Sequence, residues 1–215
     1  MKILALELST TRGSLAWLND TVDLVVLEWP NDRKNSGAFF ENLGQIQKQF
    51  GLPDTIVVGL GPGSYAGTRI AISAAIGLQA ASKARLLGLP SICAIENRNY
   101  CVIGDARRQS FFFARIRSQE LIEGPSLFSE ADLQSKLDAL QDNVPIFCSE
   151  SLPQFPLAVI GYPSAELLAR LARDSNRHFR LPPLEPIYLQ EPHVTLPKVK
   201  ESRHDHRNLS MLGGN

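Results

Sequence analysis

The chain has 215 residues, of which 44% are hydrophobic and 20% are charged, and its 22 basic residues balance its 22 acidic ones. A chain of this length forms one ordinary domain or two small lobes. The formal net charge of zero gives no overall field that would attract a nucleic acid or a membrane surface, and no apolar run is long enough to span a bilayer.

Two further features favour a cytoplasmic protein. The three cysteines, Cys93, Cys101 and Cys148, are odd in number and contain no Cys-x-x-Cys pair, which is typical of reduced thiols and not of a disulfide framework or a metal site. The first apolar run meets Glu7 after four residues and is therefore too short for a signal peptide.

Short apolar runs bounded by turn residues predict the strands of the first half of the chain. These runs cover residues 3–8, 14–18, 22–29, 55–60 and 85–89. Between them, apolar residues at i, i+4, i+7 and i+11 from Phe39 to Phe50 predict an amphipathic helix over 36–50, and Gly51-Leu52-Pro53 ends it. A second helix is predicted over 64–82.

The second half of the chain repeats this order of elements. Strands are predicted near 100–104, 110–116, 121–128, 144–148 and 157–160, and helices near 130–140 and 164–173. In the overlay of the two halves Asp105 falls on Glu7, so each half has an acid at the end of its first strand. Three strands, a helix, a strand and a helix, repeated, predict an internal duplication and a mixed sheet flanked by helices, which is an α/β fold.

We therefore expect a first lobe over residues 1–100 and a second, reduced lobe over 101–197 that ends in a returning helix. Residues 198–215 contain few apolar residues and carry four basic against two acidic side chains. This composition predicts a mobile tail, and a weak contact with RNA is a less favoured interpretation.

The most informative segment is the run Gly61-Pro62-Gly63-Ser64-Tyr65-Ala66-Gly67-Thr68-Arg69-Ile70, placed between a predicted strand and a predicted helix. Such junctions often bind anions, because the N–H groups of a helix N-terminus point outward. The run lacks the Gly-Lys-Ser/Thr of a P-loop, the spacing of a dinucleotide fingerprint and the first glycine of a nucleophile elbow. The favoured interpretation is structural: Gly61 and Gly63 form a tight turn, and Gly67 lets another helix approach closely.

Catalytic or metal-binding side chains are sparse. All four histidines lie in the last forty residues, and no pair is spaced four apart on a predicted helix, so no metal or cofactor is expected. Glu7 and Asp105 are placed where a phosphotransferase would hold a metal-binding carboxylate. The favoured alternative is that each carboxylate caps the N–H groups of its own turn.

Two apolar surfaces remain. One is formed by large side chains of the helix over 36–50, with Phe39, Phe40 and Leu43 prominent. The other is a stripe of small residues on the helix over 64–82: Gly67, Ala71, Ala74 and Ala75. Because the second helix has little polar surface, we expect a partner protein to cover one of its faces.

Four blocks of the sequence resemble the bacterial TsaB (YeaZ) family. Residues 1–10 resemble the opening that usually reads ILAIDTST, and residues 61–70 resemble the GPGSFTGLRI signature. Residues 104–107 read GDAR and resemble the beginning of the IDARMGEVY segment, with Gly in place of its first Ile. Pro186-Ile187-Tyr188-Leu189 resembles P-x-YLR. The blocks follow the family's order. Glu7, Ala66, Thr68 and Gln190 depart from the usual Asp, Thr, Leu and Arg.

This resemblance implies a duplicated actin-like fold of the Hsp70 and sugar-kinase type. It implies a non-catalytic subunit that binds the catalytic protein TsaD, together with the ATPase TsaE, and pairs with a second copy when alone. The assembly transfers a threonylcarbamoyl group to the adenosine next to the anticodon in tRNAs that read codons starting with A. The resemblance implies that the subunit contacts tRNA only as part of this assembly. The implied interface lies on the first two helices. Its expected residues are Phe39, Phe40, Leu43, Gly63, Tyr65, Gly67, Thr68, Ile70, Ala71, Ala74 and Ala75.

Two other functions stay open at this point. One is a small phosphotransferase or ATPase of the actin-like superfamily, for which Gly161-Tyr162-Pro163-Ser164 is the one candidate for an adenosine-binding motif. The other is a peptidase, which the missing nucleophile and metal motifs disfavour.

Overall fold

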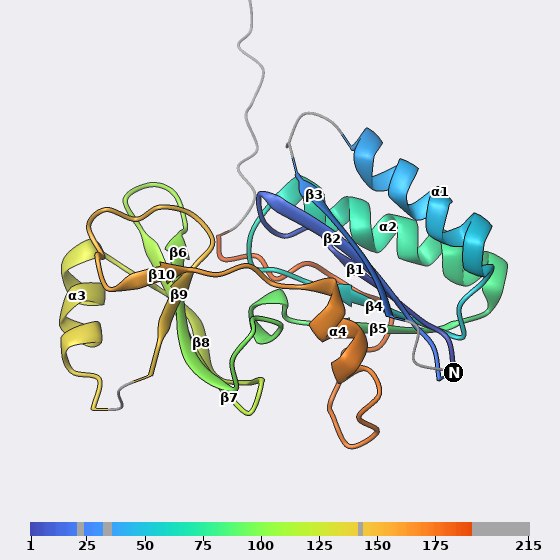
Figure 1. The fold of residues 1–215 in the computed structure, drawn as a ribbon. Helices are drawn as coiled ribbons and strands as arrows, with labels where there is room; N and C mark the ends of the chain where they lie inside the picture. Colours follow the sequence, from blue (N-terminus) through green and yellow to red (C-terminus); the bar gives the residue numbers. More distant parts are fainter. Residues whose placement is uncertain (21–23, 32–35, 142–143, 191–215) are drawn as a thin grey trace, which may run out of the picture.

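A computed structural model describes residues 1–20, 24–31, 36–141 and 144–190, which form two mixed five-stranded sheets flanked by helices (Figure 1). The predicted tail at 198–215 lies outside the described residues. None of the described helices is long and apolar enough to cross a membrane.

The first sheet has the order β3-β2-β1-β4-β5. Its strands are β1 (Ile3–Glu7), β2 (Arg12–Leu18), β3 (Leu24–Pro30), β4 (Thr55–Gly59) and β5 (Arg85–Leu89). The first three strands form an antiparallel meander, and β4 pairs with β1 in parallel, with Ile3 opposite Thr55. Two helices supply the connections around β4: α1 (Gly37–Phe50) and α2 (Tyr65–Ser82).

The second sheet has the order β10-β9-β6-β7-β8. Its strands are β6 (Asn99–Asp105), β7 (Phe111–Arg117), β8 (Glu120–Phe128), β9 (Ile146–Cys148) and β10 (Ala158–Ile160), with the helices α3 (Glu130–Asp138) and α4 (Ala165–Leu171). A short 3-10 helix, η1 (Ser91–Cys93), joins the two sheets. When the strands of each half are numbered from one to five along the chain, both sheets have the order third, second, first, fourth, fifth. The predicted α/β fold with an internal duplication is therefore confirmed.

The two halves differ between their fourth and fifth strands. In the first half α2 fills this connection, whereas residues 149–157 between β9 and β10 contain turns and no helix. The second sheet is correspondingly covered on its outer face by α3 alone among the described helices (Figure 1). Leu133 of α3 packs there against Cys101, Ile103 and Phe113.

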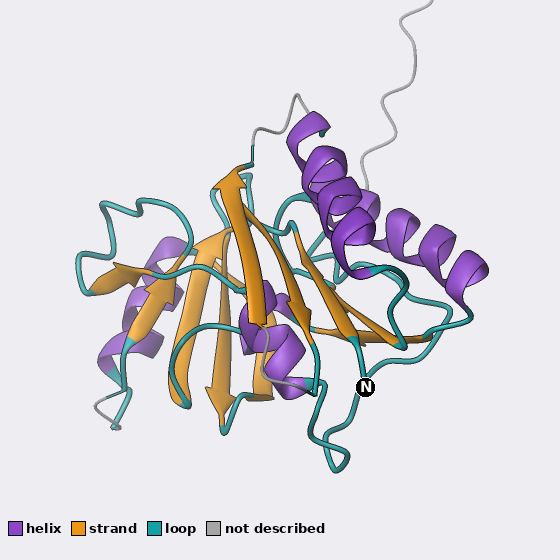
Figure 2. Cartoon of the chain, turned by 45° about the vertical axis from the view of Figure 1, so that its right-hand side comes forward, coloured by secondary structure: helices purple, strands orange, loops and turns teal. Residues whose placement is uncertain are grey.

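Alternation along β1 assigns its side chains to two separate cores. Leu4 and Leu6 face α1 and α2, whereas Ile3 and Ala5 face a core shared with the second sheet. The helix α4 belongs to this shared core: it follows the second sheet in sequence but packs against β1 and β2 of the first sheet. Figure 2 shows α4 on the opposite side of the strands from α1 and α2. The first sheet is thus covered on both faces, which explains why nearly all residues of β1 and β4 are apolar.

The sequence predictions of the elements hold within a few residues. Residues 187–189 are not paired as a strand. The Ile187 N–H donates a hydrogen bond to the Leu60 carbonyl at 2.8 Å. This contact brings the C-terminal segment to the end of β4.

Candidate functional site

The loop between β4 and α2 is fixed against the turn between β1 and β2. The Ser64 N–H donates to the Ser9 carbonyl at 2.6 Å, and a Cβ added to Gly63 would lie 2.1 Å from the same oxygen. Gly61 has φ +85°, a conformation that side-chain-bearing residues rarely adopt. The predicted tight turn at Gly61 and Gly63 is confirmed, and close approach of Ser9 is the reason that glycine is needed at 63.

Gly67 allows a different contact from the one that was expected. A Cβ at this position would lie 2.1 Å from the Leu8 carbonyl oxygen, so Gly67 admits the backbone of the β1–β2 turn and not a second helix. Ser64 caps α2, since its hydroxyl accepts a hydrogen bond from the Gly67 N–H at 3.2 Å. The first turn of α2 is therefore built on residues 8 and 9.

Glu7 and Asp105 hold equivalent turns in the two halves. The Ser9 N–H donates to Glu7 Oε1 at 2.6 Å, and the Arg107 N–H donates to Asp105 Oδ1 at 2.6 Å. The interpretation of both acids as caps of their own turns is thus confirmed. Asp105 also forms an ion pair with the Arg107 guanidinium at 3.0 Å.

The two carboxyl groups differ in their access to solvent. Glu7 is fully buried, and this burial raises the pKa of its carboxyl, although interactions with Ser9 oppose the shift. Asp105 borders an open cavity, whereas Glu7 does not line it. An enclosed carboxyl cannot coordinate a metal ion in the cavity, so Glu7 in this position is not available to a ligand there.

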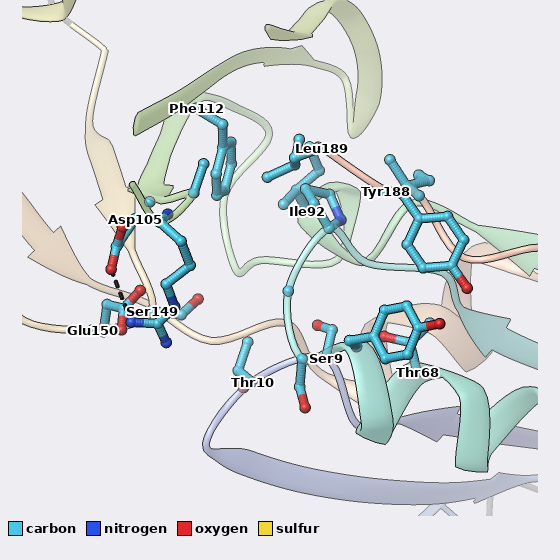
Figure 3. Close-up of a pocket in the computed structure, with 18 of the residues that line it drawn as sticks. Ser9, Thr10, Thr68, Ile92, Asp105, Phe112, Ser149, Glu150, Tyr188 and Leu189 are labelled. Carbon is cyan, nitrogen blue, oxygen red and sulfur yellow. Dashed lines mark hydrogen bonds and ion pairs between the residues drawn. The ribbon is translucent and has the colours of Figure 1, made fainter. Parts of the chain in front are cut away.

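This cavity lies between the two halves and has a volume of about 550 Å³. Its floor includes Ser9 and Thr10, one side is the start of α2, and the opposite side includes Asp105 and Glu150 (Figure 3). Ile92, Phe112 and Leu189 close the apolar upper side in this view. A volume between about 300 and 1,000 Å³ with apolar walls and a few polar groups is typical of a small-molecule site.

Sequence reasoning identified some of these cavity residues and missed others. The hydroxyl residues Ser9 and Thr10 lie inside a block that was noted for its resemblance only. The contribution of the segment 186–190 could not be expected, because it depends on the contact between Ile187 and Leu60. Within the described parts of the chain no group of three or more His, Cys, Asp or Glu side chains is placed to hold a metal ion.

Burial divides the expected interface residues into two groups. Six of them are buried within the chain itself and leave little or no side-chain surface for a partner: Phe39, Leu43, Gly67, Thr68, Ala71 and Ala75. Phe39, Leu43, Ala71 and Ala75 repeat at helical spacing on the faces of α1 and α2 that pack with Leu4 and Leu6. Gly67 lies against the Leu8 carbonyl.

The remaining expected residues stay accessible. Phe40, Gly63 and Tyr65 are exposed, and Ile70 and Ala74 are half-buried. The outer face of α2 adds residues that the sequence analysis did not name: Ser73, Ile76, Gly77 and Ala80 are all exposed. The exposed face of α2 therefore carries small residues, but it is centred on Ser73, Gly77 and Ala80 and not on Ala71 and Ala75. Ile76, 49% exposed, is the main apolar side chain on this face.

Comparison with solved structures supports this fold over nearly the whole chain. An uncharacterized protein from Pseudomonas aeruginosa with similarity to peptidase YeaZ superimposes with a TM-score of 0.67 and 22% sequence identity, covering 88% of this chain and 99% of that one. YeaZ from Pseudomonas aeruginosa superimposes with a TM-score of 0.62 and 22% identity, covering 80% and 90%. The resemblance to YeaZ expected from the four sequence blocks is thus confirmed at the level of the fold.

Sequence comparison adds less. No model of a known protein family matches the chain. An uncharacterized protein from Mycobacterium leprae is 32% identical over 88 residues, which is 37% of this chain. The matched region spans 23% of the length of that relative.

Proposed function

We propose that this chain is a member of the TsaB (YeaZ) family and serves as a non-catalytic subunit in the threonylcarbamoylation of tRNA. The observation that carries the proposal is the superposition on YeaZ-like chains, which covers 99% of one of them. The four blocks that resemble the family include segments that the fold brings together. Residues 8–9, 61–67 and 187 meet at the carboxyl ends of β1 and β4.

The buried state of Glu7 supports a non-catalytic role. In a phosphotransferase of this fold type, the acid at the end of the first strand would have to meet a metal ion or a nucleotide. Here Glu7 is enclosed, and a Cβ on Gly59 would lie 1.8 Å from its Oε2. The side chain therefore lies tightly against the end of β4 and outside the cavity lining.

The proposed partner surface is the outer face of α1 and α2. Figures 1 and 2 show the two helices side by side over one face of the first sheet. Phe40 is 53% exposed on α1, where a shallow groove runs along Glu41, Gly44 and Lys48, and Ile76 is exposed on α2. Large apolar side chains surrounded by small ones suit the packing of a helix from a partner. The partners proposed for this chain are a TsaD-like catalytic subunit and a TsaE-like ATPase, or a second copy of the chain when it is alone.

The proposal is tested by reconstitution. The chain, a TsaD-like protein, a TsaE-like ATPase, tRNA and threonylcarbamoyl-AMP are combined, and modified adenosine is measured in the tRNA. We expect modification to need the chain, while the isolated chain neither modifies tRNA nor turns over ATP. Steady ATP turnover by the isolated chain that Asp105→Ala abolishes would instead indicate the phosphotransferase function.

The surface is tested with Ile76→Arg, because an unpaired charge placed in an apolar interface costs at least about 2 kcal/mol of binding energy. Calorimetry should show more than a tenfold loss of affinity for the TsaD-like protein, with little change in thermal unfolding. Ala131→Arg on the exposed face of α3 is the matched control and should bind normally. If both variants bind as the unmodified chain does, the partner surface lies elsewhere.

A further inference from the structure

The strand β10 has one edge that pairs with no other described strand. It stands at the end of the order β10-β9-β6-β7-β8, so only its side toward β9 is paired. The Gly161 N–H donates to the Cys148 carbonyl of β9 at 2.9 Å, and the backbone polar groups of successive residues point to opposite sides of a strand. The N–H and carbonyl of Ile160 therefore point away from β9, toward the open edge.

The side chains along this edge are apolar and accessible. Leu157, Val159 and Ile160 are 75%, 57% and 47% exposed, and residues 157–160 contain neither a charged residue nor a proline. A strand edge that lacks charges and proline pairs readily with a further strand. The edge of β10 thus has the features of a surface that accepts an extended segment.

The outer strands at the other three sheet edges carry features that oppose such pairing. Gly88 of β5 exchanges two backbone hydrogen bonds with Arg180, at 2.8 and 2.9 Å, so this edge is already occupied there. Pro125 and two register shifts interrupt β8, and β3 contains Glu28 and ends at Pro30. Among the described strands, β10 is therefore the one whose outer edge lacks this protection.

The shortness of β10 favours a segment of the same chain over a separate molecule. Ala158–Ile160 has three residues, and a strand pair of that length buries far less than the roughly 1,200 Å² of a stable protein interface. A segment joined to the same chain needs a smaller contact, because its effective concentration beside the edge is of millimolar order.

The chain beyond Gln190 starts near the carboxyl end of β10. Gln190 lines the same cavity as Ser149 and Pro163, which follow β9 and β10 in the sequence. The Ser149 hydroxyl donates to the Gly161 carbonyl at 3.1 Å, so this part of the cavity wall lies beside the end of β10. A segment that follows Gln190 would reach β10 from its carboxyl end and run antiparallel to it.

The sequence after Gln190 contains a stretch of matching length. Val194-Thr195-Leu196 has two β-branched residues and no charge, a composition that favours a strand. Pro192 and Pro197 stand on either side of it, so a strand here is limited to about the length of β10.

We propose that Val194-Thr195-Leu196 binds along the open edge of β10 as an additional antiparallel strand of the second sheet. This docking goes beyond the proposed scaffold function, since it lies on the second half of the molecule and not on the outer face of α1 and α2. It covers the exposed side chains of β10 and attaches the basic segment that follows Pro197 to the second half.

The test is hydrogen exchange of the Ile160 N–H, followed by NMR in the full chain. Consecutive N–H groups of a strand point to opposite sides, so the double variant Val194→Pro, Thr195→Pro removes the one that faces β10 in either register. Leu209→Pro with Ser210→Pro is the matched control further along the chain. We expect Ile160 to exchange at least about tenfold faster in the first variant than in the unmodified chain and the control.

A dilution series separates this docking from pairing between two copies of the chain. Protection by a segment of the same chain is independent of concentration, whereas protection by a second copy decreases on about tenfold dilution. The proposal is overturned if Ile160 exchanges equally in the unmodified chain and in the Val194→Pro, Thr195→Pro variant, whether fast or slow. It is also overturned if the protection of Ile160 is lost on dilution. Both variants change residues outside the described strands, and unchanged signals of the other amides show that the fold is kept.

Discussion

Glu7 and Asp105 occupy equivalent positions in the two halves of the molecule, and each carboxylate accepts a hydrogen bond at 2.6 Å from the N–H two residues further on. Each ends the first strand of its sheet. The local contact has been kept in both halves, whereas the environments have diverged: Glu7 is enclosed in the first half and Asp105 borders the cavity.

The enclosure of Glu7 predicts a specific pH dependence. Its pKa in the folded state is raised above the ordinary 4.5, so the unfolded chain loses this proton first as pH rises. The contribution of Glu7 to the free energy of unfolding is fully present below about pH 4.5. It is lost as the pH rises from there through the raised pKa, by as much as about 1.4 kcal/mol per pH unit. Glu7→Gln should remove this loss. Urea unfolding from about pH 4 to 8 measures it, with the exposed Glu41→Gln as control. Parallel curves for the unmodified chain and Glu7→Gln would contradict the prediction.

Two glycines of α2 should respond oppositely to alanine. At Gly67 the new Cβ would meet the Leu8 carbonyl at 2.1 Å, whereas at Gly77 no atom lies within 4 Å. We expect Gly67→Ala to destabilise the chain by at least about 2 kcal/mol through displacement of the helix start. Gly77→Ala should stabilise it by about 0.5–1 kcal/mol, the difference in helix propensity. Thermal unfolding of the pair decides this, and a similar shift in both would show that the approach of Leu8 is not tight.

The docking of α4 on the first sheet depends on Ser14. The Ser14 hydroxyl accepts a hydrogen bond from the Ala165 N–H at 2.9 Å across 151 residues of sequence. Ser14→Ala should leave this buried N–H without a partner and cost about 1–3 kcal/mol of stability. Hydrogen exchange should then show faster exchange in α4, with Ser73→Ala on the exposed face of α2 as the control. Unchanged protection of α4 would show that apolar packing alone holds it.

The three cysteines should be unreactive in the folded chain. Cys93, Cys101 and Cys148 are all buried as thiols, and burial raises the pKa of Cys93 to about 12. Since the thiolate is the reactive form, a disulfide reagent at about pH 8 should label none of them until the chain unfolds. The rate of labelling should therefore increase with urea in step with unfolding. Rapid labelling of one thiol in the native state would reveal local opening at that position.

The sequence by itself determined the elements and their duplication. Alternating and continuous apolar runs define the strands of both sheets, and the spacing from Phe39 to Phe50 defines α1, because these patterns reflect which side of an element is buried. The glycine loop could also be interpreted, since an unusual backbone conformation restricts which residue can occupy the position.

Only the tertiary structure decided which apolar residues were core and which were surface. Ala71 and Ala75 resemble surface positions in a small-residue stripe, yet both are fully buried, whereas Ile76 is half exposed. A helix that is apolar on most sides carries too little contrast for its orientation to be inferred from sequence. The cavity likewise depends on contacts across long separations, such as Ile187 with Leu60 and Ser64 with Ser9. These contacts form only when segments far apart in the chain pack together, and no local pattern records them.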